Sequence, residues 1–93
     1  MQIPEVTIYS KPGCCLCEQA KEQLATLQAT YEFILREINI LQDLSLYNKY
    51  KEKIPVIFIN GRKVFEYRLD EKQFIRLLKS AAQERPEQAA PAH

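Results

Sequence analysis

The sequence predicts an α/β fold in which helices cover both faces of one small sheet. Apolar residues alternate with polar ones in some segments and recur every three or four positions in others, and the two kinds of segment follow each other along the chain. A chain of 93 residues suffices for one domain with a single modest core. The order strand, helix, strand, helix, hairpin, helix gives four strands, and a right-handed crossover joins the first two.

The first strand and the first helix meet at a cysteine-rich turn. Residues 3–9 are rich in β-branched side chains that alternate with polar ones, which predicts a strand ending near Ser10. The sequence Lys-Pro-Gly at 11–13 then breaks the strand. Residues 14–28 follow a helical spacing, so the three cysteines lie on the first turn of a helix.

The second half of the chain supplies the remaining elements. We predict strands at residues 31–40, 56–59 and 62–67, and helices at residues 43–51 and 71–82. The segment 56–59 is apolar on both faces, as in a central strand, and the Asn-Gly pair that follows it favours a two-residue hairpin turn. Charged side chains in the returning segment indicate an edge strand.

The chain ends in a segment of different composition. Asp70 and Gln73 form a variant of the capping box that begins the last predicted helix. Residues 84–93 carry two prolines and no apolar periodicity, so we expect a disordered tail. The domain then comprises residues 1–83.

Charge and hydropathy exclude several function classes. The 13 Lys and Arg residues against 12 Asp and Glu give a net charge of +1, and neither sign forms a long block. This balance argues against nucleic acid or an anionic membrane as a partner. No apolar stretch is long enough for a membrane span, and the first residues do not resemble a signal peptide. We therefore expect a cytoplasmic monomer.

The cysteine turn carries the chemistry. In a helix, residues three apart lie about 5 Å from each other, so Cys14 and Cys17 can form a disulfide without moving the backbone. The first turn of a helix stabilises a thiolate. Cys14 is nearest the helix tip and Cys17 shares the apolar face, which predicts Cys14 as the attacking thiolate and Cys17 as the resolving thiol. Lys11 would favour the thiolate, whereas Glu18 would oppose it.

Two other roles for these cysteines stay open. A structural zinc site needs four ligands, and the only histidine is His93 in the tail, but a copper(I) ion can be held by two thiolates. Copper chaperones have the order βαββαβ, whereas this chain ends on a helix. A dithiol that binds a partner without turnover, as a copper(I) chaperone or a redox-sensing adaptor, is the alternative function. Cys15 falls on the polar face, where we expect it to be exposed and comparatively inert.

Pro55 begins a predicted central strand, where its missing N–H would cost a hydrogen bond. An ordinary trans proline at a strand start is one explanation. A cis Ile54-Pro55 bond is the other, and it would expose backbone groups of Ile54 to an extended substrate.

The stretches "VTIYSKPGCCLC" and "KIPVIFING", followed by a hairpin and a last helix, resemble the glutaredoxin branch of the thioredoxin superfamily. The resemblance covers residues 3–82 and is greatest to the small glutaredoxin-like proteins of bacteria and plastids. It implies a thioredoxin-like fold, βαβαββα with a four-stranded mixed sheet, and a cis Pro55 facing the nucleophile Cys14 and the resolving Cys17. It also matches Lys11 to the lysine that binds the glycine carboxylate of glutathione.

The resemblance implies a thiol-disulfide oxidoreductase that reduces protein disulfides or glutathione mixed disulfides, with no metal and no tightly bound cofactor. Glutathione or a reductase of the thioredoxin-reductase type would supply the electrons. The chain has "FEYRLDE" where well-studied glutaredoxins have a Gly-Gly turn and an acidic residue, and Arg68 and Asp70 would supply polar contacts instead. "CCLC" replaces the usual C-P-Y-C, and Cys17 departs from the C-G-F-S pattern of cluster-binding members.

Overall fold

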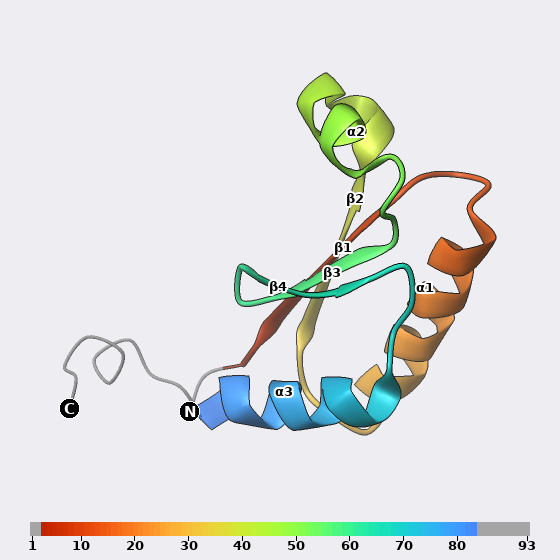
Figure 1. Cartoon of the computed structure of the whole chain (residues 1–93). Coiled ribbons are helices and arrows are strands. Elements are labelled where there is room, and N and C mark those ends of the chain that lie inside the picture. The colour runs from red at the N-terminus through yellow and green to blue at the C-terminus, as the bar shows by residue number, and fades with distance from the viewer. Residues whose placement is uncertain (1–2, 84–93) are drawn as a thin grey trace, which may run out of the picture.

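The computed structural model describes residues 3–83, and Figure 1 shows their arrangement. The elements are β1 (Glu5–Ser10), α1 (Cys15–Gln28), β2 (Ile34–Asn39), the short 3-10 helix η1 (Ile40–Gln42), α2 (Leu44–Tyr50), β3 (Val56–Ile59), β4 (Arg62–Glu66) and α3 (Glu71–Gln83). This is the predicted order, with η1 as an addition. The predicted tail at 84–93 lies outside the described residues.

The four strands form one mixed sheet in the order β2-β1-β3-β4. β1 and β2 are parallel and are joined through α1, whereas β3 is antiparallel to both β1 and β4. β3 is therefore a central strand and β4 an edge strand, as the sequence predicts. The thioredoxin-like fold class is confirmed.

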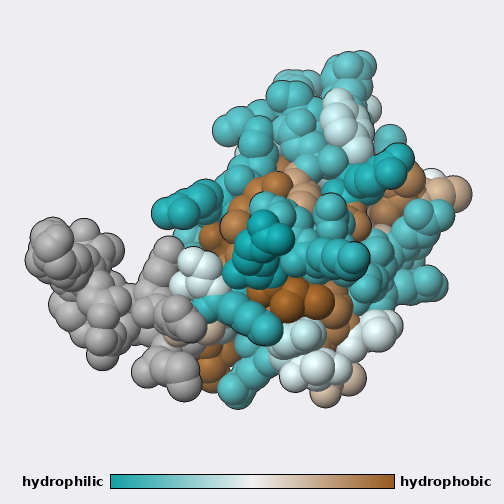
Figure 2. Space-filling model, turned by 60° about the horizontal axis from the view of Figure 1, so that its bottom comes forward, coloured by the Kyte–Doolittle hydropathy of each residue, from teal (hydrophilic) through white to brown (hydrophobic). Residues whose placement is uncertain are grey.

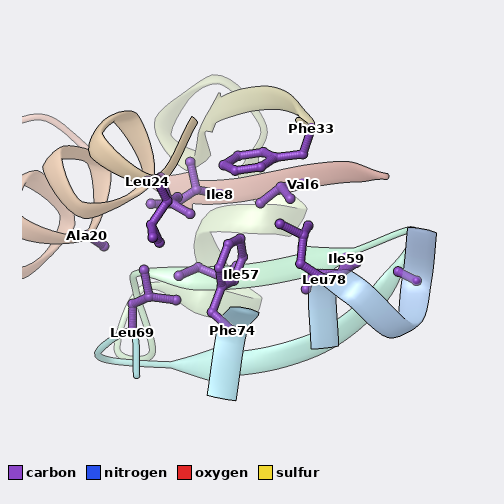
Figure 3. Packing of buried hydrophobic residues seen from close by; sticks show 12 residues of the cluster. Val6, Ile8, Ala20, Leu24, Phe33, Ile57, Ile59, Leu69, Phe74 and Leu78 are labelled. Atoms are coloured by element: carbon purple, nitrogen blue, oxygen red, sulfur yellow. The ribbon is translucent and has the colours of Figure 1, made fainter. Parts of the chain in front are cut away.

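The larger core lies between one face of the sheet and the helices α1 and α3. Val6 and Ile8 of β1 point to this face, and Leu24 of α1 and Phe74 of α3 pack against it. Figure 3 shows the Phe74 ring beside Ile57 of β3, with the side chains of Val6 and Ile8 on the neighbouring strand. Burial of these apolar side chains is the main source of stability for a domain of this size.

A smaller core lies on the opposite face of the sheet and contains the ends of several elements. Its buried members are Cys17, Ile40, Tyr50, Ile54 and Val56, and α2 covers it with partly buried Leu46 and Tyr47. The helices thus cover both faces, with α2 on one and α1 and α3 on the other. Figure 2 shows that the side of the molecule near α3 is mostly hydrophilic, with hydrophobic residues visible between polar ones.

Several boundaries differ from the predicted ones, by one or two residues at β1, α1, α2, β4 and α3 and by three residues at the start of β2. β2 begins at Ile34 rather than at residue 31, because each of its residues pairs with one residue of β1 and β1 begins at Glu5. The chain then turns at once into η1, where Asn39 caps the first turn by accepting a hydrogen bond from the Leu41 N–H at 2.9 Å. β4 ends at Glu66, one residue early, because the next residue leaves the extended conformation.

The predicted hairpin turn and the predicted helix cap at Asp70 are both present. The turn between β3 and β4 has φ of 52° at Asn60 and 83° at Gly61, as a two-residue hairpin of this type requires. At the start of α3, the Asp70 carboxylate accepts a hydrogen bond from the Gln73 N–H at 3.2 Å. Asp43 does the same for α2, accepting from the Ser45 N–H at 2.8 Å.

Candidate active site

Cys14 occupies the N-cap position of α1 instead of its first turn. The chain leaves β1 through a tight loop in which Gly13 has φ of +80°, a value that glycine adopts without steric cost. The Cys14 sulfur then accepts a hydrogen bond from the Cys17 N–H at 3.2 Å, in the place where a serine or aspartate oxygen would cap the helix. The sulfur therefore lies at the N-terminus of α1, beside the N–H of Cys17.

Cys17 lies one turn further, on the inner face of α1, and is fully buried. Burial raises the pKa of the Cys17 thiol to about 12, and the neighbouring Cys14 sulfur adds to the rise, while the Lys11 backbone and the Lys21 charge oppose it. The thiol is therefore protonated at neutral pH. The two sulfurs are in different states of exposure, as the sequence predicts.

Cys14 and Cys15 also differ in their exposure to solvent. Cys14 is half-buried rather than protruding from the helix tip, because it packs against the smaller core with Tyr9 and Leu46. Cys15 is exposed, as expected. All three cysteines are free thiols in this structure.

The Ile54-Pro55 peptide bond is cis, and both residues are buried. Ile54 belongs to the same core cluster as Cys14 and Cys17, although it lies far away in the sequence. Among the described residues, neither the N–H nor the C=O of Ile54 is engaged in a hydrogen bond. The backbone groups of this one residue are therefore left without a hydrogen bond in a segment that shares a core cluster with the two cysteines.

The other predicted binding residues lie around this centre at different positions. Lys11 is half-buried in the loop that leads to Cys14. Arg68 is exposed and faces the outer side of α1 across a cleft. Asp70 is exposed and already caps α3. Cys14, Cys17 and Ile54 share one core cluster and Pro55 follows Ile54 in the chain, while Arg68 and Asp70 belong to the segment between β4 and α3.

Three aromatic rings pack together in the smaller core, next to the end of β1. The ring of Tyr9, next to the end of β1, lies 5.0 Å from that of Tyr50 and 5.2 Å from that of Phe58, measured between centroids. Such edge-to-face and offset arrangements stabilise aromatic clusters beyond their buried area. They hold the end of β1, and with it the cysteine loop, against α2 and β3.

Within residues 3–83, no group of three histidine, cysteine or acidic side chains is arranged to hold a metal ion. Over the same range, no helix is long and apolar enough to cross a membrane.

Residues 5–79 match a known protein family, described as the Glutaredoxin-like domain (DUF836). The chain belongs to this glutaredoxin-like family. A curated relative from Dictyostelium discoideum, the "Glutaredoxin-like protein YDR286C homolog", is 31% identical over 72 residues, which cover 71% of this chain and 67% of the relative. An uncharacterised protein of Mycobacterium tuberculosis is 28% identical over 76 residues, which cover 76% of this chain and 78% of that protein.

Two solved structures are similar to this chain. Protein Ne2328 from Nitrosomonas europaea superposes with a TM-score of 0.73 at 28% identity, covering 83% of this chain and 93% of that one. A mutant thioredoxin from Halobacterium salinarum superposes with a TM-score of 0.63 at 20% identity, covering 89% and 78% of the two chains. The second likeness shows the thioredoxin-like fold alone.

Two features of this glutaredoxin-like site were not predicted. Tyr67, which follows β4, has φ of 74°, and its N–H donates to the Pro55 C=O at 2.9 Å and to the Lys53 C=O at 3.2 Å. It ties the end of β4 to the cis-proline segment. A left-handed conformation is unusual for a bulky residue, and only the "FEYRLDE" departure from the Gly-Gly pattern could have drawn attention to it.

The second feature is an ion-pair network beside Cys17. Lys21 lies 2.8 Å from Glu37 of β2 and 2.9 Å from Glu18, and the Ser10 hydroxyl donates to Glu37 at 3.2 Å. Hydrogen bonds to Glu37 and Glu18 raise the pKa of Lys21, and the bond from Lys21 lowers the pKa of Glu37. Glu18 is thus engaged with Lys21. Its helical spacing to Lys21 is visible in the sequence, whereas the Glu37 contact depends on the pairing of the strands.

Proposed function

We propose that this protein is a thiol-disulfide oxidoreductase that reduces disulfides of proteins or mixed disulfides of glutathione. One observation carries the proposal: the half-buried Cys14 sulfur accepts a hydrogen bond from the N–H of the fully buried Cys17. A substrate has access to the first sulfur only, and the second sulfur lies beside the first. This division of exposure is what an attacking and a resolving cysteine require.

The reaction has two exchange steps. In the first, the Cys14 thiolate attacks one sulfur of the substrate disulfide, so a Cys14–substrate disulfide forms and the other substrate sulfur leaves as a thiolate that takes a proton. In the second, Cys17 loses its proton and attacks the Cys14 sulfur, which releases the remaining substrate thiol. The protein is left with a Cys14–Cys17 disulfide, and the substrate has gained two electrons and two protons.

The surrounding residues would hold the substrate during these steps. The N–H and C=O of Ile54, beside Pro55, would pair with an extended substrate backbone at the attacked sulfur. Lys11 would bind a carboxylate of the substrate or of glutathione. Arg68 and Asp70 would supply polar contacts on the side of α3.

The oxidised protein needs an electron donor to complete a cycle. Glutathione is one candidate, since two molecules of it would reduce the Cys14–Cys17 disulfide and leave glutathione disulfide. A reductase of the thioredoxin-reductase type is the other. Free thiols of this kind persist in the cytosol, which is the compartment we propose.

The test is steady-state reduction of a small mixed disulfide with glutathione as the only electron donor. We expect turnover by the unaltered protein, complete loss in Cys14→Ser, and retention in Cys15→Ser, which removes an exposed sulfur from the same turn. Retention of full activity in Cys14→Ser would refute the assignment. Turnover with a reductase but not with glutathione would identify the other donor.

Stoichiometric reaction without turnover under every donor would instead favour a dithiol binding module. Titration of copper(I) against the reduced protein and against Cys14→Ser then separates a copper chaperone from a redox-sensing adaptor.

A further inference from the structure

A cleft of about 650 Å³ lies between the outer face of α1 and the segment that joins β4 to α3. One wall is formed by successive turns of α1 and the other by the start of α3 and the residues before it. The lining residues that matter here are Leu16, Glu22, Gln23, Thr26, Arg68 and Glu71. We call this cleft the α1 groove.

One residue that lines the α1 groove, Leu16, belongs to the cysteine turn. Leu16 lies between Cys15 and Cys17 in the sequence and is 46% exposed, so an apolar side chain next to the dithiol in the sequence lines the groove. On the other wall, Arg68 directly follows Tyr67, which is hydrogen-bonded to the Pro55 C=O. One wall of the groove therefore includes a residue of the cysteine turn, and the other includes the neighbour of a residue that is hydrogen-bonded to the cis-proline segment.

The length of the groove indicates what it can accept. Leu16 and Thr26 are separated by ten residues of helix, which is about 15 Å along the helix axis. An extended chain rises about 3.3 Å per residue, so the wall matches a segment of about four to five residues. A tripeptide such as glutathione would span only about 10 Å of it. A segment of a protein substrate uses the whole length.

The charges of the lining favour a basic segment. The lining contains two carboxylates, Glu22 and Glu71, and one guanidinium, Arg68. Among residues 3–83, neither Glu22 nor Arg68 takes part in an ion pair. The Gln23 amide donates to Glu71 at 3.1 Å and so connects the two walls. The net charge of the lining side chains is negative, and Gln23 and Thr26 offer hydrogen bonds to a peptide backbone.

We propose that the α1 groove docks the protein segment that flanks the attacked disulfide, and that it selects extended segments with basic side chains. This rests on the proposed function, because the segment enters the groove as its cysteine becomes bonded to Cys14. The groove then determines which protein disulfides react fastest, while small disulfides react without it.

The test uses peptides that carry one cysteine as a mixed disulfide with 2-nitro-5-thiobenzoate. Attack by the Cys14 thiolate joins it to the peptide sulfur, breaks the original S–S bond and releases the coloured nitrothiobenzoate, whose absorbance gives the rate. The cysteine is flanked on both sides by about four residues, which are lysine-rich, glutamine-rich or glutamate-rich. The small disulfide formed by 2-mercaptoethanol and the same coloured thiol is measured alongside.

We expect the lysine-rich peptide to react faster than the glutamate-rich one, by about two- to fivefold for each groove carboxylate. This ratio corresponds to the free energy of one exposed ion pair. Glu22→Gln and Glu71→Gln should each reduce this ratio, and Arg68→Gln should increase it. Glu32→Gln, which makes the same charge change at an exposed position outside the groove, should leave the ratio unchanged. The three Glu→Gln variants should react normally with the small disulfide.

An equal ratio in the unaltered protein and in Glu22→Gln would overturn the inference while leaving the proposed function intact, provided that the small disulfide reacts through Cys14. A glutathione mixed disulfide that reacts faster than every peptide would overturn it too, since the groove would then serve a small thiol. Absence of reaction with the small disulfide would refute the proposed function, and the inference with it.

Discussion

At the scale of single residues, the contrast between Cys14 and Cys17 controls the chemistry. Cys17 is fully buried, and burial raises the pKa of its thiol to about 12. The Cys17 thiol loses its proton readily only when an acceptor such as a departing thiolate or a carboxylate is close. Reaction of Cys17 with dissolved reagents, before a substrate is bound to Cys14, is therefore unfavourable. Lys21 is the charged residue that opposes this rise in pKa.

We therefore predict selective alkylation of the reduced protein by iodoacetamide at about pH 8. Cys14 and Cys15 should be modified, and Cys17 should stay unmodified until the protein is denatured, because its sulfur is both inaccessible and protonated. Peptide mapping by mass spectrometry gives the extent at each position. Modification of Cys17 at the rate of Cys15 in the folded protein would contradict the prediction.

Tyr67 provides a second prediction at this scale. A non-glycine residue in the left-handed region costs about 1–2 kcal/mol, and the Tyr67 side chain is half-exposed, so little burial is lost on its removal. Glycine adopts this φ freely but increases the entropy of the unfolded chain by an amount worth about 0.4–1 kcal/mol. We expect Tyr67→Gly to be as stable as the unaltered protein or more stable by up to about 1 kcal/mol.

Tyr67→Val serves as the opposite control, since a β-branched side chain is least tolerant of a positive φ. It should lower the free energy of unfolding in urea relative to both other proteins. A Tyr67→Gly variant that is as much less stable than the unaltered protein as Tyr67→Val is would show that the tyrosine ring, and not the backbone conformation, determines stability at this position.

At the scale of elements, the start of α3 combines two possible roles of Asp70. Its carboxylate caps the helix through the Gln73 N–H, and the sequence pattern also places it among the substrate-binding residues. The cap alone predicts that Asp70→Ala lowers the free energy of unfolding by about 1 kcal/mol, while Asp70→Asn retains most of it.

The same pair of variants separates capping from binding. An asparagine caps a helix but carries no charge. Turnover with a glutathione mixed disulfide should therefore stay normal in Asp70→Asn if Asp70 acts only as a cap, and should decrease through a higher KM if the carboxylate binds the ligand. A stability loss in Asp70→Asn equal to that in Asp70→Ala would contradict the capping role itself.

At the scale of the whole molecule, Lys21 and Glu37 join α1 to β2 on the edge of the sheet. The bond from Lys21 lowers the pKa of Glu37, so this pair stabilises the fold above the ordinary pKa of a glutamate. The stabilisation is lost as the pH falls through the lowered pKa of the folded state. The raised pKa of Lys21 has the opposite effect on the pH dependence of stability. Its stabilising contribution is present below the ordinary pKa of a lysine and is lost at higher pH.

We predict that Lys21→Met lowers the free energy of unfolding near neutral pH by less than about 1 kcal/mol, because the Glu37 side chain is 50% exposed. The difference from the unaltered protein should shrink as the pH falls below the ordinary pKa of a glutamate. Urea unfolding across this range measures it, with Lys72→Met on α3 as the control. A difference that is independent of pH would contradict the linkage.

The sequence was sufficient for the order of the main elements and for the deeper burial of Cys17 than of Cys14, because both follow from periodicity. The spacing that places Cys17 with Ala20 and Leu24 on one helical face also buries it in the structure. The contacts that depend on distant pairing were not accessible in the same way. Glu37 meets Lys21 only because β2 lies beside β1, and the short helix η1 forms where β2 runs out of partner residues.

The backbone at Tyr67 shows the same limit. Nothing in its residue type favours a left-handed conformation, and the hydrogen bonds to Lys53 and Pro55 that accompany it arise from the arrangement of β3 and β4. The α1 groove likewise exists only where α1 and the segment before α3 meet. Sequence reasoning predicted Arg68 as a polar contact without showing that it faces α1.

The most direct test of the account is the mass of the intact protein after reaction with one equivalent of a small symmetrical disulfide. We predict that the unaltered protein becomes lighter by two hydrogens and keeps no adduct, because Cys17 displaces the thiol bound to Cys14. Cys17→Ser should keep one adduct on Cys14, and Cys14→Ser should form none at Cys17. A stable adduct on Cys14 in the unaltered protein, or a reaction at Cys17 in Cys14→Ser, would contradict the account.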